Sequence, residues 1–221
     1  MTGNKTEKAI LHQLNLVMEE KFNNINQLNK ENLNLLSVVF GKNKILKLND
    51  QEINYLMQKN DLKTASIYGW NSLMLALKNN KNHDLNLTEE QLGYLIDHSN
   101  LKQFNDANYN ALMIAIINHK KQELSLSENH WDKLIKNSDL KLIEKKTKLN
   151  VFELAVFNKL DKKIIEQIVK ELVKKKIKFF YPEHFSQNFQ KELLIIKESI
   201  DIQQKIENQV NNNKNQKTNK I

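Results

Sequence analysis

The strongest constraint in this sequence is that it repeats itself. Residues 71–77, Asn-Ser-Leu-Met-Leu-Ala-Leu, return 39 positions later at 110–116 as Asn-Ala-Leu-Met-Ile-Ala-Ile. The same offset leads backward to a copy that begins at Asn32, and a further copy begins at Asn150, 40 positions after Asn110. A repeat of this length is typical of a supersecondary unit that buries its apolar side against neighbouring copies, so the sequence predicts a stacked array.

Each copy is predicted to contain two helices. The first carries an apolar cluster around a small residue, where a larger side chain would push neighbouring helices apart. These small residues are Ser37, Ala76, Ala115 and Ala155. The second helix is expected to begin after a good capping residue, Asn49, Thr88 or Ser127 in successive copies. Three residues on stand Glu52, Gln91 and His130, of which the first two suit a capping box.

The repeats also predict the domain organisation. We expect the array to span residues 31–177, with an N-terminal capping helix within 1–30 and a C-terminal capping helix within 178–207. The apolar residues of the C-terminal helix are Phe185, Phe189, Leu193, Ile196 and Ile200. Residues 208–221 are rich in Asn and Lys and are predicted to be disordered. The predicted fold class is an all-α solenoid of helix-turn-helix repeats.

The repeats resemble ankyrin repeats. The residues that match this family's turn are Asp61-Leu62-Lys63, Asn100-Leu101-Lys102 and Asp139-Leu140-Lys141. Gly69 and Asn108 stand where the family has its hairpin glycine, and Asn tolerates the left-handed backbone better than most residues. Asn71-Ser72-Leu73 and Asn110-Ala111-Leu112 match its Thr-Pro-Leu, followed by Ala76 and Ala115 at its alanine.

The sequence also departs from the ankyrin pattern. The family repeats about every 33 residues, so roughly six residues are inserted here between the two helices of most copies. The copy from Asn150 lacks this insertion, and the proline and histidine of the family signature are missing throughout. HEAT or armadillo arrays, with periods of about 40 to 47 residues, are the nearest alternative. The short first helix and the long polar turn favour the ankyrin type.

The composition argues against an enzyme. The chain has no cysteine, and its four glycines are too scattered to form a phosphate-binding loop. Its six histidines show no metal-ligand spacing. The sequence therefore predicts no catalytic residues, no bound cofactor and no metal site.

Aromatic residues at the expected hairpins indicate a binding surface. The resemblance to ankyrin arrays implies that hairpin tips and first helices line a concave groove that binds a protein partner. The corresponding residues are Ile67, Tyr68, Trp70, Asp106, Ala107 and Tyr109. Tyr and Trp are frequent interface anchors, although Trp70 and Tyr109 could equally pack against neighbouring turns. We predict a protein interaction scaffold.

A lysine-rich surface that binds nucleic acid or an acidic partner is the alternative to the protein scaffold. Every one of the 34 basic residues is lysine, and the net charge is +8. The densest runs, Lys145-Lys146 and Lys174-Lys175-Lys176, suit binding of nucleic acid or of an acidic partner. Arginine is the usual reader of bases and phosphates, so its absence favours a protein partner.

The first 30 residues begin with polar side chains and lack the apolar core of a secretory signal, and no long apolar run suits a membrane span. We therefore expect a cytoplasmic monomer that does not bind a membrane. The family resemblance implies an alternative, an effector secreted into a host cell, because bacterial and symbiont ankyrin proteins are often delivered into host cells.

Overall fold

The computed structural model describes residues 35–46 and 48–177. Beyond them it describes only Lys191, Leu194, Ile195, Glu198, Ile202, Lys205 and Gln209, each helical and exposed. The predicted N-terminal helix within 1–30 lies outside the described residues. Apart from those single positions, so do the predicted C-terminal helix and tail.

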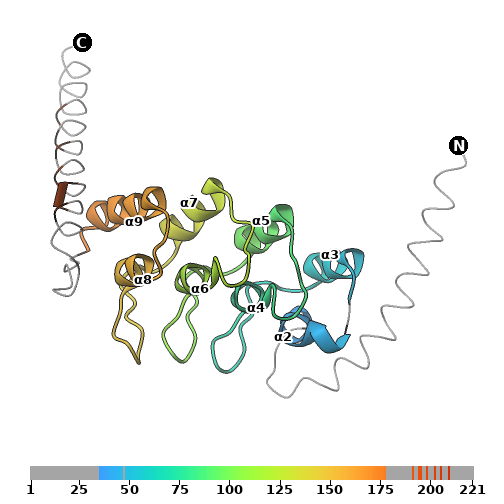
Figure 1. Cartoon of the computed structure of the whole chain (residues 1–221). Coiled ribbons are helices and arrows are strands. Elements are labelled where there is room, and N and C mark those ends of the chain that lie inside the picture. The colour runs from blue at the N-terminus through green and yellow to red at the C-terminus, as the bar shows by residue number, and fades with distance from the viewer. Residues whose placement is uncertain are drawn as a thin grey trace, which may run out of the picture.

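The described residues form eight α-helices and no strand, so the all-α prediction is confirmed. The helices are α2 (Leu35–Leu46), α3 (Asp50–Lys59), α4 (Ser72–Asn79), α5 (Glu89–His98), α6 (Ala111–Asn118), α7 (Glu128–Asn137), α8 (Val151–Phe157) and α9 (Lys162–Lys174). Figure 1 shows two rows, one of α2, α4, α6 and α8 and one of α3, α5, α7 and α9. Neighbours in the first row pack against each other, and so do α5, α7 and α9 in the second.

An asparagine begins each first helix from α4 onward, buried at Asn71 and Asn110 and half-buried at Asn150. The side-chain oxygens of Asn71, Asn110 and Asn150 accept the backbone N–H three residues on, at 2.9, 3.0 and 3.0 Å. The amide nitrogen of Asn71 donates to the carbonyl oxygen of Asn100 at 3.3 Å, and that of Asn110 donates to Asp139 at 2.9 Å. At Asn71 and Asn110, one side chain thus caps a helix with its oxygen and holds the turn that leads into the following repeat with its nitrogen.

The second helices begin where the sequence predicts. Asn49, Thr88 and Ser127 are the N-caps of α3, α5 and α7. The side chain three residues on accepts the N–H of the cap: Glu52 at 2.9 Å, Gln91 at 2.9 Å and His130 at 3.4 Å. His130 therefore takes the place of the usual acid or amide.

One continuous apolar core runs through both rows, from Leu36 in α2 to Leu172 in α9. Ala76, Ala115 and Ala155 are fully buried in it, as predicted from their place in the repeat. The equivalent Ser37 is buried as well, and its hydroxyl lies 2.9 Å from that of Ser72 in α4. These small side chains allow the first helices to approach closely.

The inserted residues form two ordered loops, 80–88 and 119–127, that bind each other. Asn80 accepts the Leu87 N–H at 2.8 Å and donates to the carbonyl oxygen of Gln122 at 3.1 Å. The Gln122 side chain accepts in turn the N–H groups of Lys81 and Asn82, at 3.1 and 3.2 Å. Only residues 158–161 separate α8 from α9, which confirms the shorter final connection.

Replacing Ala115 by leucine should destabilise the protein. Ala115 is fully buried in α6, which packs against α4 and α8, so the added carbons must displace a neighbouring helix. We expect Ala115→Leu to lower the free energy of unfolding by about 1 to 3 kcal/mol in urea denaturation. Ser125→Leu, at an exposed loop position, is the matched control and should change it by less than about 0.5 kcal/mol. Equal stability of the two variants would contradict the helix packing described here.

Candidate binding surface

Three loops that lead into the first helices form similar hairpins, of which the third is one residue longer. Isolated antiparallel bridges join Ala65 to Asn71, Phe104 to Asn110 and Ile143 to Asn150. Inside each bridge a backbone N–H donates across the loop: Ser66 to Trp70 at 2.8 Å, Asn105 to Tyr109 at 3.0 Å and Glu144 to Leu149 at 3.0 Å. Figure 1 shows the loops extending from the row of α4, α6 and α8.

The residue that closes each hairpin supplies a side-chain acceptor, although its type changes from copy to copy. Ser66 accepts the Trp70 N–H at 3.1 Å. Asn105 accepts the N–H of Ala107 at 3.1 Å and of Tyr109 at 2.9 Å. Glu144 accepts the Lys146 N–H at 2.7 Å and both the N–H and the hydroxyl of Thr147. An oxygen acceptor therefore recurs at this position, on a neutral side chain in the first two hairpins and on a carboxylate in the third.

Neighbouring hairpins are joined by hydrogen bonds. The Asp106 N–H donates to the Tyr68 carbonyl at 3.0 Å, and the Lys145 N–H donates to the Ala107 carbonyl at 3.2 Å. Asn108 adds a side-chain bond to the carbonyl of Ile143 at 3.2 Å. The hairpins thus form one rigid ladder of backbone.

The six predicted partner-binding residues lie on the first two of these hairpins. Ile67 and Tyr68 are 67% and 48% exposed, as an interface requires. Asp106 is exposed and Ala107 half-buried, and both also hold the hairpin ladder together through their backbone.

Trp70 and Tyr109 instead pack partly against the core. The Lys78 ammonium lies 4.5 Å from the centre of the Trp70 ring. Burial raises the pKa of the Tyr109 hydroxyl, and the charge and hydrogen bond of Glu144 raise it further. Packing inside the array therefore accounts for much of the role of these two aromatics.

Sequence reasoning missed two exposed apolar side chains. Phe104 and Ile143 are 47% and 51% exposed at equivalent positions of the second and third hairpins. We call Ile67, Tyr68, Phe104 and Ile143 the hairpin row. The equivalent residue of the first hairpin, Ala65, is small. Comparison of the aligned copies shows the apolar residues, but nothing local indicates that they lack cover.

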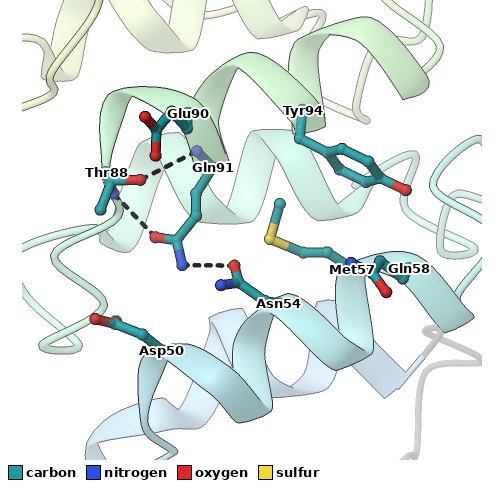
Figure 2. Close-up of a pocket in the computed structure, with 8 residues that line it drawn as sticks. All are labelled: Asp50, Asn54, Met57, Gln58, Thr88, Glu90, Gln91 and Tyr94. Atoms are coloured by element: carbon teal, nitrogen blue, oxygen red, sulfur yellow. Dashed lines mark hydrogen bonds between the residues drawn. The ribbon is translucent and has the colours of Figure 1, made fainter. Parts of the chain in front are cut away.

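A cavity of about 320 Å³ lies between α3 and α5 (Figure 2). Gln91 donates to the side-chain oxygen of Asn54 at 2.8 Å, joining the two helices. One repeat on, Gly93 and His130 take these two places, and a Cβ on Gly93 would lie 2.7 Å from His130 Nε2. Close packing of α5 and α7 at this point thus depends on the glycine. The cavity has two carboxylates, Asp50 and Glu90, and no lysine or histidine among its lining residues, so it offers acceptors but no acid–base pair.

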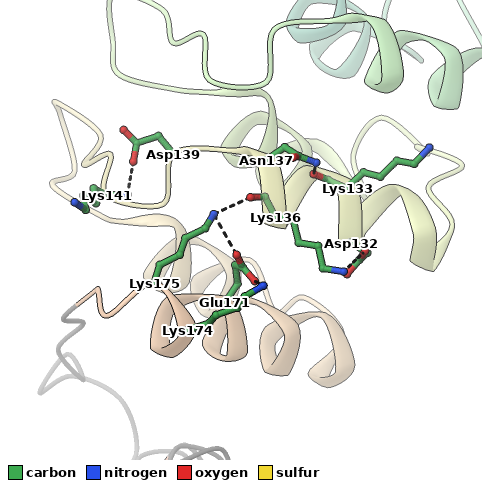
Figure 3. A network of polar contacts seen from close by, with 9 residues as sticks. All are labelled: Asp132, Lys133, Lys136, Asn137, Asp139, Lys141, Glu171, Lys174 and Lys175. Atoms are coloured by element: carbon green, nitrogen blue, oxygen red, sulfur yellow. Dashed lines mark hydrogen bonds and ion pairs between the residues drawn. The ribbon is translucent and has the colours of Figure 1, made fainter. Parts of the chain in front are cut away.

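The predicted basic runs lie at two places. Lys145 and Lys146 are exposed on the third hairpin. Lys174 and Lys175 lie at the end of α9, 3.8 and 3.3 Å from the Glu171 carboxylate, and Lys175 also donates to the Lys136 carbonyl at 2.7 Å (Figure 3). The second run is therefore largely engaged within the protein.

Gly69 should be irreplaceable in the hairpin ladder. Its φ of +77° is rare for any residue with a side chain, and a Cβ there would lie 2.3 Å from the carbonyl oxygen of Phe104. We expect Gly69→Ala to lower the free energy of unfolding by roughly 1 to 3 kcal/mol. Gly41 in α2, where a Cβ would meet nothing within 4 Å, is the control, and Gly41→Ala should stabilise by about 0.5 to 1 kcal/mol. Urea denaturation of both variants should therefore give changes of opposite sign.

Glu144 should make the stability depend on pH. Its side chain is 2% exposed, and burial alone would raise its pKa, but hydrogen bonds from Thr147, Lys146 and Tyr109 lower the pKa overall. The folded state therefore favours the ionised carboxylate. This stabilisation is present above the pKa of the unfolded chain, about 4.3, and is lost as the pH falls through the lower pKa of the folded state.

We expect Glu144→Asn, which installs the acceptor used by the second hairpin, to cost about 1 kcal/mol at pH 7 and less at pH 3. Glu144→Ala removes the acceptor and should cost more than Glu144→Asn at pH 7. Denaturant unfolding at the two pH values measures both differences. A Glu144→Asn cost that is unchanged at pH 3 would show that the charge of Glu144 does not stabilise the hairpin.

No protein-family model matches this chain, and no curated protein matches it significantly. In the part of the chain that the structure describes, no three His, Cys, Asp or Glu side chains are placed to hold a metal ion. Among the same residues, no helix combines the length and apolar character needed to cross a bilayer.

Proposed function

We propose that the helix pairs form an ankyrin-like solenoid and that this protein is a non-enzymatic scaffold, which binds a protein partner through the hairpin row. The observation that carries the proposal is the exposure of large apolar side chains on three successive hairpins. Ile67, Tyr68, Phe104 and Ile143 are each about half exposed or more. Gathered apolar exposure of this kind marks binding surfaces on soluble proteins.

The backbone beneath the row also suits binding. Hydrogen bonds join the hairpins to each other at Asp106 and Lys145, so the apolar side chains stand on a framework that is already ordered. The scaffold therefore loses little conformational entropy when a partner binds. The hairpins of an ankyrin-like array form one wall of its groove, which agrees with this location.

Charge around the row indicates the chemistry of the partner. Lys145 and Lys146 are exposed on the third hairpin beside Ile143, whereas Asp106 is exposed on the second. Such polar groups at the rim of an apolar patch contribute mainly to orientation and specificity. The partner should therefore present apolar side chains with acidic residues at the end that faces the third hairpin.

The test is the loss of partner capture by a variant that leaves the core intact. We expect the double variant Tyr68→Ser, Phe104→Ser, immobilised as the full-length chain, to recover about tenfold less of the partner than the wild type does. The physical reason is that both side chains would act as interface anchors. Quantitative mass spectrometry of the bound proteins measures the loss, and circular dichroism verifies the helices.

Phe157→Ser is the matched control. Phe157 is an exposed phenylalanine too, at 70%, but it ends α8 and lies outside the hairpins. Its replacement should leave the captured proteins unchanged. If the double variant retained the same proteins as the wild type, the hairpin row would not be the binding surface.

A further inference from the structure

A second surface lies where the second helices end. Two open cavities of about 600 and 580 Å³ share Lys102 and Asn137 and are lined largely by equivalent residues of successive repeats. We call them together the lysine groove. Its lysines are Lys63, Lys102, Lys133, Lys136, Lys141 and Lys175, against which only Asp97 and Asp139 among the lining residues carry negative charge.

Three of these lysines are engaged within the protein. Lys133 donates to Asp97 at 2.5 Å, and Lys136 pairs with Asp132 at 2.8 Å. Lys175 bonds the Lys136 carbonyl and the Glu171 carboxylate, as Figure 3 shows. Positive charge at these helix ends also complements the helix dipole, so structure alone accounts for them.

The other three, which we call the ladder lysines, recur with the period of the repeat. Lys63, Lys102 and Lys141 lie 39 residues apart, are exposed, and form no ion pair within 48–177. The charge of Lys63 acts weakly on Asp61, whose pKa is lowered mainly by hydrogen bonds from the Lys63 N–H and the Thr64 hydroxyl. Within residues 48–177, no ion pair explains why lysine recurs at this position in three copies.

Backbone hydrogen bonds fix the turn that carries each ladder lysine. The N–H of Lys63, Lys102 and Lys141 donates to the side chain two residues before it, at 3.0, 3.1 and 2.9 Å. The residue between, Leu62, Leu101 or Leu140, is buried in the core. Each lysine thus starts from the same fixed turn, and only its side chain is free to move.

Two serines of the groove have buried hydroxyls without a hydrogen-bond partner in the described structure. They are Ser99 and Ser138, which follow α5 and α7 at equivalent positions, and Ser138 is 4% exposed. These hydroxyls are covered by the protein itself, so a ligand in the groove would meet the exposed lysines and not the serines.

From this geometry we propose that the lysine groove binds an acidic peptide segment with a carboxylate at about every third residue. Packed helices lie about 8 to 10 Å apart, which sets the step of the ladder. A polyproline II segment has three residues per turn and a rise of about 3.1 Å per residue, so one face of it repeats about every 9 Å. Carboxylates on that face meet successive lysines.

A single-stranded nucleic acid fits this groove less well. Binding of single strands relies on aromatic side chains that stack with bases, and the apolar residues that line the groove are aliphatic: Ile96, Leu101, Leu140 and Ile177. The lysine groove shares no residue with the hairpin row, so this proposal does not depend on the proposed function.

The experiment measures binding of a fluorescent peptide of repeated Glu-Pro-Pro units to the full-length chain by anisotropy. The comparison peptide has the same composition with its glutamates gathered at one end, and oligo-dT tests nucleic acid. We expect the repeated peptide to bind best. Replacing Lys63, Lys102 and Lys141 together by glutamine should weaken its binding about tenfold, as loss of three exposed ion pairs would.

A matched triple variant controls for total charge. Lys121, Lys162 and Lys170 are exposed and lie outside the groove, and their replacement by glutamine should change the affinity less than about twofold. Equal weakening by both triple variants, or equal binding of the two peptides, would overturn the proposal. Tighter binding of oligo-dT that depends on the ladder lysines would replace the peptide with nucleic acid.

Discussion

Close packing of the first helices on one another is the constraint on which the rest of this structure depends. Fully buried alanines in α4, α6 and α8 keep these helices near enough for the loops at their ends to meet. Only at that spacing can the Asp106 N–H reach the Tyr68 carbonyl, or Asn110 reach the carbonyl of Asp139. Larger side chains at the alanines would separate these pairs and leave buried polar groups unsatisfied.

Variation among the copies occurs where the same physical task has several solutions. Each hairpin has an oxygen acceptor, which Ser66, Asn105 and Glu144 supply in turn. Between the second helices, equivalent positions make different contacts. Asn54 and Gln91 form a hydrogen bond, whereas one repeat on Gly93 leaves room for His130. A change in one copy is therefore matched by a change in the next.

The two proposed surfaces differ in the interaction that they offer. The hairpin row presents apolar side chains on an ordered backbone, and contacts of this kind gain free energy mainly by removing apolar area from water. The lysine groove presents charge, whose contribution is modest per contact and falls with salt. A partner that used both would gain affinity from the first and orientation from the second.

The repeat in the sequence was enough to predict the number and order of the described helices, the N-caps of α3, α5 and α7, and the small residues of the core. These features depend on contacts within about four residues or on a pattern repeated in every copy, and both can be read along the chain. Only the tertiary structure decided which side chains are exposed. Trp70 and Tyr109 are partly covered by the core, whereas Phe104 and Ile143 are open, because exposure depends on how the segments pack together and not on the residue type. The lysine groove was hidden for the same reason: its ladder lysines lie 39 residues apart, and stacking of the repeats brings them together along one surface.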